Sequence, residues 1–214
     1  MLSQVLALVS PNLPIGGFGY SQGLEAAVED GLLGSVSDFR EYLSHNLSAL
    51  AYSDLPLIKR LYESKEVSDF QFWTDRCVAL RNTAEFRAEE RDRGRALCRL
   101  IKDICVYEED YLAVAKGSYL SAFAYYAREN RIQLYDTLES YFFAYTEAQC
   151  IAAVKLVPIG QTDAWRIIRQ LTLNWGEVYK KVLSVDDEMI GSGLVNLSIL
   201  SVKHESQYSR IFRS

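Results

Sequence analysis

The stretch LESYFFAYTEAQCIA, residues 138–152, decides the fold class of this chain. Its apolar side chains recur at steps of three and four, at Leu138, Tyr141, Tyr145, Ala148 and Ala152. That spacing follows the period of an α-helix, about 3.6 residues, and not the alternation of a β-strand. We therefore expect one long helix here, with one face buried in a core.

The same rhythm recurs along the chain and predicts its architecture. Residues 57–157 contain no proline, as expected where long helices follow one another. Four more stripes repeat the helical spacing: Phe39, Leu43, Leu47 and Leu50; Phe70, Trp73, Cys77, Leu80 and Ala84; Leu112, Ala115, Tyr119, Ala122 and Tyr126; and Ile168, Leu171, Trp175, Val178 and Val182. We expect a single all-α domain over residues 1–214, a helical bundle of roughly eight to ten helices.

Polar residues mark where several of these helices should begin. Ser37 precedes the Phe39 stripe, and the sequence SDFQ at residues 68–71 is typical of a capping box. Thr137 and Thr162 stand where they can cap two later helices. Lys180 and Lys181 carry the charge that favours a helix C-terminus, so we expect a helix to end just after them.

Composition and charge exclude several classes of function. The net charge of −5 argues against non-specific binding to nucleic acid, which requires a basic surface. No apolar run approaches the roughly 18 residues of a membrane span. Residues 1–10 lack the basic start of a signal peptide. We expect a cytoplasmic protein that binds neither nucleic acid nor membranes.

The histidines and cysteines do not form a recognisable catalytic or metal motif. His45 and His204 are far apart, and only His204 has an adjacent carboxylate, that of Glu205. The four cysteines form no CxxC pair and fall on or beside apolar stripes, which predicts buried free thiols. No histidine stands near a serine or cysteine signature of a catalytic triad. We expect no catalytic residue, no bound cofactor and no metal site.

A glycine-rich loop, residues 10–31, opens the chain with the sequence SPNLPIGGFGYSQGLEAAVEDG. A phosphate-binding loop is one interpretation, but the glycines neither follow a strand nor precede a Lys-Ser/Thr pair. A structural turn with Ser21 as a helix cap is the second. A loop that faces a partner is the third, because aromatic residues on a flexible loop, here Phe18 and Tyr20, are typical contact anchors.

Two internal segments allow a structural and a functional interpretation. The arginine-rich segment 81–100 predicts a helix whose charges are solvated, or a charged docking face, and Gly94 within it would permit close helix packing. At residues 152–165, a helix should end near Leu156 before a Pro-Gly turn. Lys155 either complements that helix end or, with Gln161, contacts a partner.

The last segment, VKHESQYSRIFRS at residues 202–214, is unlike a disordered tail. It carries the apolar anchors Tyr208, Ile211 and Phe212 beside the cations Arg210 and Arg213. Disordered tails are usually poor in aromatic residues. We expect this segment either to pack on the body of the protein or to fold on binding a partner.

Four motifs, in this order along the chain, together resemble the UreF family of urease accessory proteins. They are LPIGGFGYSQGLE at 13–25, EERDRGRAL at 89–97, KLVPIGQTD at 155–163 and HESQYSRIFRS at 204–214. Gly19 and Ile211 depart mildly from the family pattern. By position, the resemblance implies partner-binding roles for Pro14, Gly16, Phe18, Tyr20, Ser21, Gln22, Gly23, Glu25, Lys155, Pro158, Gln161, His204, Glu205, Tyr208, Ser209, Arg210, Phe212 and Arg213.

The same resemblance implies a function and a set of partners. It implies an all-α homodimer without enzymatic activity, which joins UreD (UreH in some organisms) and the GTPase UreG to apo-urease for nickel insertion. It also implies that residues 203–214 form a tail ordered by the UreD-type partner. Two alternatives stay open: a regulator that accelerates GTP hydrolysis by UreG, which the many arginines allow, and an independent nickel carrier, which two separated histidines disfavour.

Overall fold

Twelve α-helices and two short 3-10 helices make up the computed structural model, which describes residues 2–191 and 195–214, and those residues contain no strand. The α-helices are α1 (Leu2–Leu8), α2 (Leu24–Glu29), α3 (Val36–Leu50), α4 (Asp54–Glu63), α5 (Val67–Ala79), α6 (Ala84–Ile104), α7 (Glu109–Ala115), α8 (Tyr119–Glu129), α9 (Leu134–Leu156), α10 (Gln161–Thr172), α11 (Trp175–Leu183) and α12 (Val195–Glu205). The 3-10 helices are η1 (Gly17–Gly19) and η2 (Asp187–Met189). The all-α class is confirmed, whereas the number of helices exceeds the expected eight to ten.

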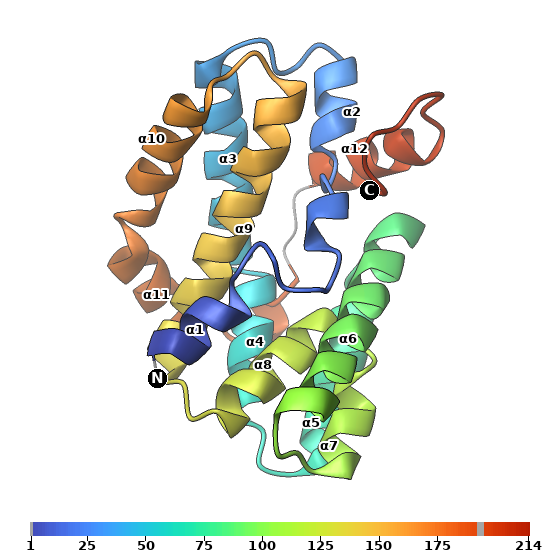
Figure 1. Ribbon diagram of the computed structural model, residues 1–214, viewed down its shortest axis with the longest axis vertical. Helices are drawn as coiled ribbons and strands as arrows, with labels where there is room; N and C mark the ends of the chain where they lie inside the picture. The colour runs from blue at the N-terminus through green and yellow to red at the C-terminus, as the bar shows by residue number, and fades with distance from the viewer. Residues whose placement is uncertain (1, 192–194) are drawn as a thin grey trace.

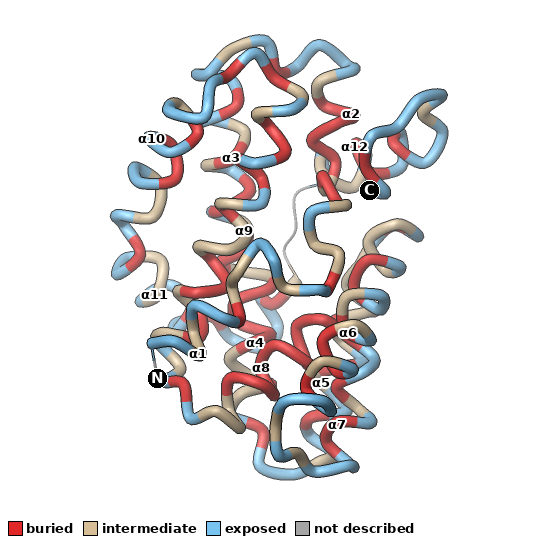
Figure 2. Tube along the Cα trace, in the orientation of Figure 1, coloured by how far each residue is buried: buried red, intermediate tan, exposed pale blue. Residues whose placement is uncertain are grey.

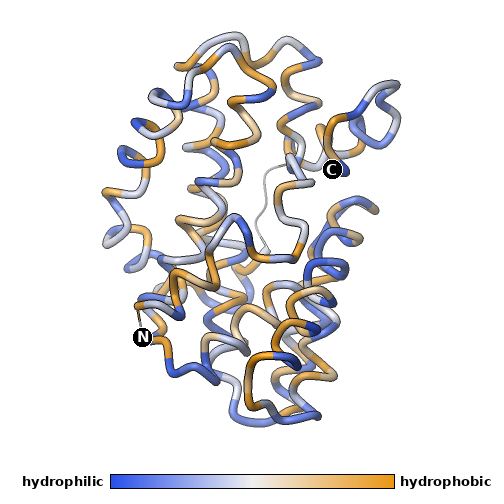
Figure 3. The backbone as a smooth tube through the Cα atoms, viewed as in Figure 1, coloured by the Kyte–Doolittle hydropathy of each residue, from blue (hydrophilic) through white to orange (hydrophobic). Residues whose placement is uncertain are grey.

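Helix α9, with 23 residues, is the longest element and the axis of the fold. It contacts α1, α2, α3, α4, α10 and α11. A second group consists of α4 to α8, in which α6 and α4 pack on α8, and α4 therefore joins the two groups (Figure 1). Helix α12 lies at one side, against α2 and α6. Buried and hydrophobic residues gather where the helices face one another, as the apolar stripes predict (Figures 2 and 3).

Two of the predicted helices are each divided by a turn, which explains the larger count. The Leu112–Tyr126 stripe is shared between α7 and α8, and the Oγ of Ser118 between them accepts a hydrogen bond from the Ser121 backbone N–H at 3.3 Å. The Ile168–Val182 stripe is shared between α10 and α11. In both pairs the stripe residues on either side of the turn face the core. The apolar spacing therefore continues across the turn, and the turn could not be predicted from that spacing.

The predicted helix starts are mostly wrong by two to four residues. The N-cap of α3 is Ser35 and not Ser37, and its Oγ accepts from the Asp38 backbone N–H at 3.2 Å. Helices α5, α9 and α10 begin after Glu66, Gln133 and Gly160. Thr137 lies inside α9, where its hydroxyl donates to the Gln133 carbonyl at 2.9 Å and needs no capping role. Ser68 and Thr162 likewise lie inside first turns.

The expected helix ends at Leu156 and after Lys181 are both close to the observed ones. Helix α9 ends at Leu156, and α11 ends at Leu183 with Lys180 and Lys181 in its last turn. The helix of Lys181 is not the continuation of a longer one, because α11 begins only at Trp175. Charges of the right sign at a helix end are thus a better guide here than single capping residues at a helix start.

Gly94 allows α6 and α8 to cross at close range, as its place in the middle of a predicted helix indicated. A Cβ atom at this position would lie 2.6 Å from the carbonyl carbon of Ser118. The crossing also buries Glu90, whose Oε1 accepts from the Ser118 hydroxyl at 2.6 Å and from the Leu120 backbone N–H at 2.9 Å. A helix N-terminus inside the core is therefore satisfied by a carboxylate from its neighbour.

The four cysteines are free, and three of them are buried as the stripes predicted. Burial raises the pKa of the Cys98 and Cys150 thiols to about 12 and also raises that of Cys77. Cys105, which follows the end of α6, is only half-buried. Among the described residues, no group of three or more His, Cys, Asp or Glu side chains is placed to hold a metal ion. In the same residues, no helix has the length and hydropathy to cross a membrane.

Candidate partner-docking site

The end of the chain packs across the opening loop, 193 residues away in sequence. The carbonyl oxygen of Ser214 accepts hydrogen bonds from the backbone N–H groups of Ser21 and Gln22 at 2.5 and 2.9 Å, and from the Ser21 hydroxyl at 2.7 Å. The backbone N–H of Arg213 donates to the Gly19 carbonyl at 2.7 Å. Two motifs that the sequence places at opposite ends therefore form one structure.

Glu25 of α2 fixes the backbone of the tail. Its Oε1 accepts from the N–H of Ile211 at 2.7 Å, and its Oε2 accepts from the N–H of Phe212 at 3.0 Å. The Glu25 side chain is buried, so these two hydrogen bonds form away from water. Hydrogen bonds to a charged acceptor are among the stronger ones in proteins, and they hold the tail in one register.

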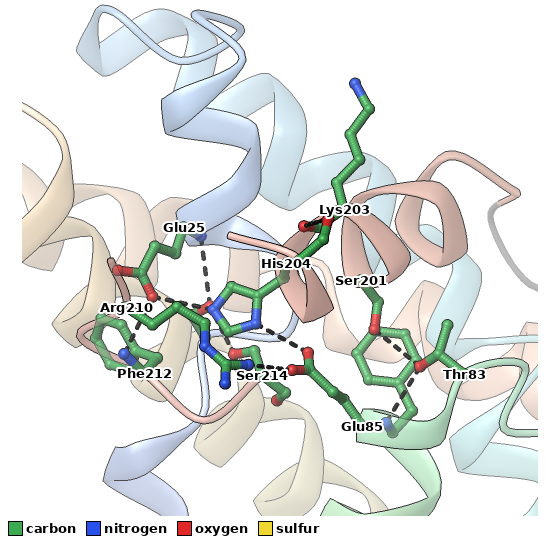
Figure 4. A network of polar contacts seen from close by, with 12 residues as sticks. Glu25, Thr83, Glu85, Ser201, Lys203, His204, Arg210, Phe212 and Ser214 are labelled. Atoms are coloured by element: carbon green, nitrogen blue, oxygen red, sulfur yellow. Dashed lines mark hydrogen bonds and ion pairs between the residues drawn. The ribbon is translucent and has the colours of Figure 1, made fainter. Parts of the chain in front are cut away.

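His204, in the last turn of α12, lies completely buried between two carboxylates (Figure 4). Its Nε2 is 3.1 Å from Glu25 Oε2, and its Nδ1 is 2.9 Å from Glu85 Oε2. Arg210 donates to the other oxygen of Glu85 at 2.7 Å. The hydroxyls of Thr83 and Ser201 lie 2.8 Å apart and add a further link between α6 and α12. Glu205 is exposed and does not share a site with His204.

Glu89 of α6 accepts hydrogen bonds from both the tail and the opening loop. Its Oε1 accepts from Gln22 Nε2 and from Arg93, each at 2.8 Å, and its Oε2 accepts from the Ser214 hydroxyl at 3.2 Å. Gln22 adopts the left-handed backbone region with φ of 52°, which is uncommon for a residue other than glycine. Its side chain and its N–H are both held, so the surrounding contacts maintain this conformation.

The start of α2 differs from the expected one. Its N-cap is Gly23, with φ of 85°, and not Ser21. The Ser21 hydroxyl does accept from the Glu25 backbone N–H, at a long 3.4 Å, but its shorter contact is the one to Ser214. Side chains of α12 lie 3.3 Å from the position of a Gly23 Cβ, so a side chain would fit poorly there. Ser21 and Gly23 therefore serve the contact between loop and tail more than the helix start.

Aromatic residues complete the contact between loop and tail. Phe212 and Tyr20 are buried, and both line a groove of about 80 Å³ between the loop and α9. The Nζ of Lys155 lies 5.5 Å from the centre of the Phe212 ring, within the range of a cation–π contact. Burial raises the pKa of Tyr20, against the effect of a hydrogen bond with Arg213, so its phenol stays protonated.

The remaining predicted residues are exposed around this site. Phe18 is 73% exposed, Tyr208 is fully exposed and Ile211 is 67% exposed. Val195, Ile199 and Val202 form an exposed apolar row on the outer face of α12. The rest of the exposed set comprises Pro14, Pro158, Gln161, Ser209 and Arg213, and Gly16 is half-buried. Pro158 lies in the turn between α9 and α10, and Gln161 is the first residue of α10.

The arginine-rich segment 81–100, which is helical only from Ala84 onward, has buried charges as well as solvated ones. Arg81 contacts Asp54 and Glu90, each at 2.7 Å, and Tyr141 donates to Asp54 at 2.5 Å. Burial and then the charge of Asp54 hold the pKa of Tyr141 well above its usual range. This network borders a cavity of about 110 Å³. Arg91, Arg95 and Arg99 lie on the exposed face, where a solvated helix surface was one interpretation.

Comparison with known proteins extends over the whole chain. The model of the UreF family matches residues 33–172. Three curated relatives share the description "Urease accessory protein UreF". The one from Pseudomonas entomophila is 40% identical and covers 100% of this chain and 97% of its own length. The one from Alkalilimnicola ehrlichii is 38% identical and covers 97% of this chain and 93% of its own length. The one from Klebsiella pneumoniae is 36% identical and covers 99% of this chain and 96% of its own length.

Proposed function

This chain belongs to the UreF family of urease accessory proteins, and from that premise we propose that it is a non-enzymatic scaffold of urease maturation. In this proposal it acts in the cytoplasm as a homodimer that joins a UreD-type protein and the GTPase UreG to apo-urease while nickel is inserted. Those partners come from the family resemblance. The structure supports a scaffold through the surface built by the opening loop, α12 and the tail.

One observation carries the proposal. The outer face of α12 and the tail exposes the apolar side chains of Val195, Ile199, Val202, Tyr208 and Ile211, while the inner face is fixed by buried hydrogen bonds. An exposed apolar surface on a rigid support is typical of protein–protein contact. We propose this outer face, which we call the α12–tail surface, as the binding site of the UreD-type protein.

Co-purification with the UreD-type partner tests the surface directly. The variant Tyr208→Ala/Ile211→Ser removes two exposed side chains and should leave the helical circular dichroism unchanged. It should lose most of the bound partner, because truncated aromatic anchors often cost 2 kcal/mol or more, about thirtyfold in affinity. Deleting residues 203–214 would also remove buried His204 from its helix, so surface substitutions are the cleaner test.

The matched control is Val106→Ser, because Val106 is 92% exposed and lies beyond α6. This variant should retain the partner at the level of the unmodified protein. Equal retention by both variants would show that the α12–tail surface does not bind the UreD-type protein, and would refute the proposal in its present form.

A regulator of UreG is the second candidate, and the exposed arginines favour it. Arg91, Arg99, Arg210 and Arg213 all reach solvent, and an arginine inserted beside a nucleotide typically accelerates phosphoryl transfer by about 10³-fold or more. Multiple-turnover GTP hydrolysis by UreG with and without this chain separates the two roles. GTP hydrolysis rates that agree within about twofold with and without this chain support the scaffold. A rate increase of about 10³-fold supports the regulator.

A further inference from the structure

An open groove of about 530 Å³ lies where α5, α6 and α7 meet. Each of these three helices contacts the other two (Figure 1). None of the described residues that line the groove belongs to the α12–tail surface or to the contact between loop and tail. The groove is therefore a separate feature of the molecule, and the proposed scaffold role does not use it.

The lining of the groove combines basic and apolar side chains. Arg87 and Arg91 stand one turn apart on α6, and both line the groove. Val78 of α5 and Val114 of α7 line it as well, and both are half-buried. Asp75 of α5 is the one acid among the described lining residues. The groove therefore carries a local excess of positive charge, although the net charge of the chain is −5.

The two arginines of the groove have unused hydrogen-bond donors. Arg91 is exposed, and it forms no ion pair or hydrogen bond through its side chain with another described residue. Arg87 donates from Nη1 to the Arg81 carbonyl at 2.8 Å, which leaves most of its donors free. Asp75 neutralises neither of them, because its described partner is Gln71 Nε2 at 2.9 Å. A guanidinium group presents its N–H donors in a fork that fits a carboxylate.

The same lining distinguishes between classes of anionic ligand. A phosphate group is usually held by free backbone N–H groups, but the N–H of Arg87 is bonded to the Thr83 carbonyl at 3.1 Å. The N–H of Gly117 is likewise bonded to the Val114 carbonyl at 2.9 Å. None of the described lining residues is aromatic, so a nucleotide base has no ring on which to stack. Free arginines beside apolar side chains suit a protein segment that carries both carboxylates and an apolar residue.

We propose that the groove between α5, α6 and α7 binds an acidic segment of another protein, whose carboxylates pair with Arg87 and Arg91. An apolar side chain of the same segment packs on Val78 and Val114. The α5 side of the groove extends over residues 71–79, about 12 Å, which matches roughly two turns of a helix in the partner. Exposed ion pairs of this kind are weak and sensitive to salt, so the contact is a transient one. The proposal does not rest on the scaffold role, because the α12–tail surface contributes no residue to it.

Fluorescence anisotropy with the full chain and two labelled peptides tests the groove. The first peptide carries leucine at every third or fourth position and glutamate elsewhere, and the second has lysine in place of glutamate. The glutamate peptide should bind more tightly, although the net charge of −5 by itself favours the lysine peptide. Arg91→Glu should weaken binding of the glutamate peptide by about fivefold or more. Asp75→Asn removes the acid of the groove and should strengthen that binding by up to about fivefold.

The matched control is Arg99→Glu, which makes the same charge change at an exposed position of α6 outside the groove. Arg99 lies about 12 Å along the helix from Arg91, farther than the Debye length of about 8 Å at 0.15 M salt. At this salt concentration Arg99→Glu should change the affinity by less than about twofold. Equal weakening by both reversals, or tighter binding of the lysine peptide, would overturn the proposal. So would displacement of the glutamate peptide by inorganic phosphate beyond the effect of sodium chloride at equal ionic strength, which would indicate a simple anion site.

Discussion

Replacing Gly94 by Ala in the middle of α6 should destabilise the protein, although alanine favours helices. At an open helical site, Gly→Ala contributes up to about 1 kcal/mol of stability. Here the new Cβ would lie 2.6 Å from the Ser118 carbonyl carbon, 2.8 Å from its oxygen and 2.9 Å from the Tyr119 nitrogen. All three are backbone atoms of another segment, so no side chain can turn aside.

The magnitude follows from the separation that α6 and α8 need. Carbon atoms pack at about 3.5–4.0 Å, so the two segments must move apart by roughly 1 Å. Overpacking of this kind typically costs about 1–3 kcal/mol. The movement also lengthens the hydrogen bonds from the Ser118 hydroxyl and the Leu120 N–H to Glu90, now 2.6 and 2.9 Å. The weakened hydrogen bonds add about 1 kcal/mol, which roughly cancels the helix-propensity gain, so we expect a net loss of about 1–3 kcal/mol in the free energy of unfolding.

Urea unfolding followed by circular dichroism measures this change, and α11 offers the matched control. Gly176 is also inside a helix, but a Cβ there would meet nothing within 4 Å. Gly176→Ala should therefore be neutral or stabilise the protein by up to about 1 kcal/mol. Opposite signs for the two substitutions support the close crossing. If Gly94→Ala stabilised the protein as much as Gly176→Ala does, the account of the α6–α8 contact would be wrong.

Three further outcomes are expected. Phe212→Ala should expose the tail to cleavage by trypsin at Arg210 and Arg213. The main unfolding transition should change little, since a docked terminal segment opens separately from the core. Equal cleavage rates for the variant and the unmodified protein would count against the observed docking. At pH 8, a thiol reagent should react first with Cys105, because burial raises the pKa of Cys98 and Cys150 to about 12 and leaves almost no thiolate there; rapid labelling of all four would contradict this. Calorimetry on tag-free protein should detect nickel binding no tighter than about micromolar, and because His204 is buried between two carboxylates, His204→Ala should not abolish such weak binding; a sub-micromolar site would revive the nickel-carrier alternative.

The fold class could be predicted from the sequence because helical periodicity is local. The stripe at residues 138–152 depends only on residues within one helix, and α9 contains all of it. The turns after α7 and α10 could not be predicted in the same way, because the stripe continues across each of them. Thr137 shows the limit for capping, since a threonine hydroxyl can bond inside a helix as readily as at its start.

Only part of the candidate site could be predicted from the sequence. Its loop and tail residues stand in recognisable motifs, but Glu85 and Glu89, which hold the tail from α6, were not identified as site residues. Their signal was a pair of acids four residues apart on one helix, which also describes many solvated surfaces. Their partners lie 119 and 125 residues further along the chain, and pairing at such distances has no periodic pattern.

The contact of Ser214 with Ser21 and Gln22 has a consequence for synthesis. A ribosome adds roughly 5–20 residues per second and releases the N-terminal half first, so the opening loop leaves the ribosome many seconds before its acceptor exists. During that interval the N–H groups of Ser21 and Gln22 can bond only to water or to a foreign carbonyl. A product that stops before residue 214 lacks this acceptor, however well its bundle folds. The closed loop thus requires that residue 214 has been made, and a partner that binds only the closed form would not bind chains that stop before this residue.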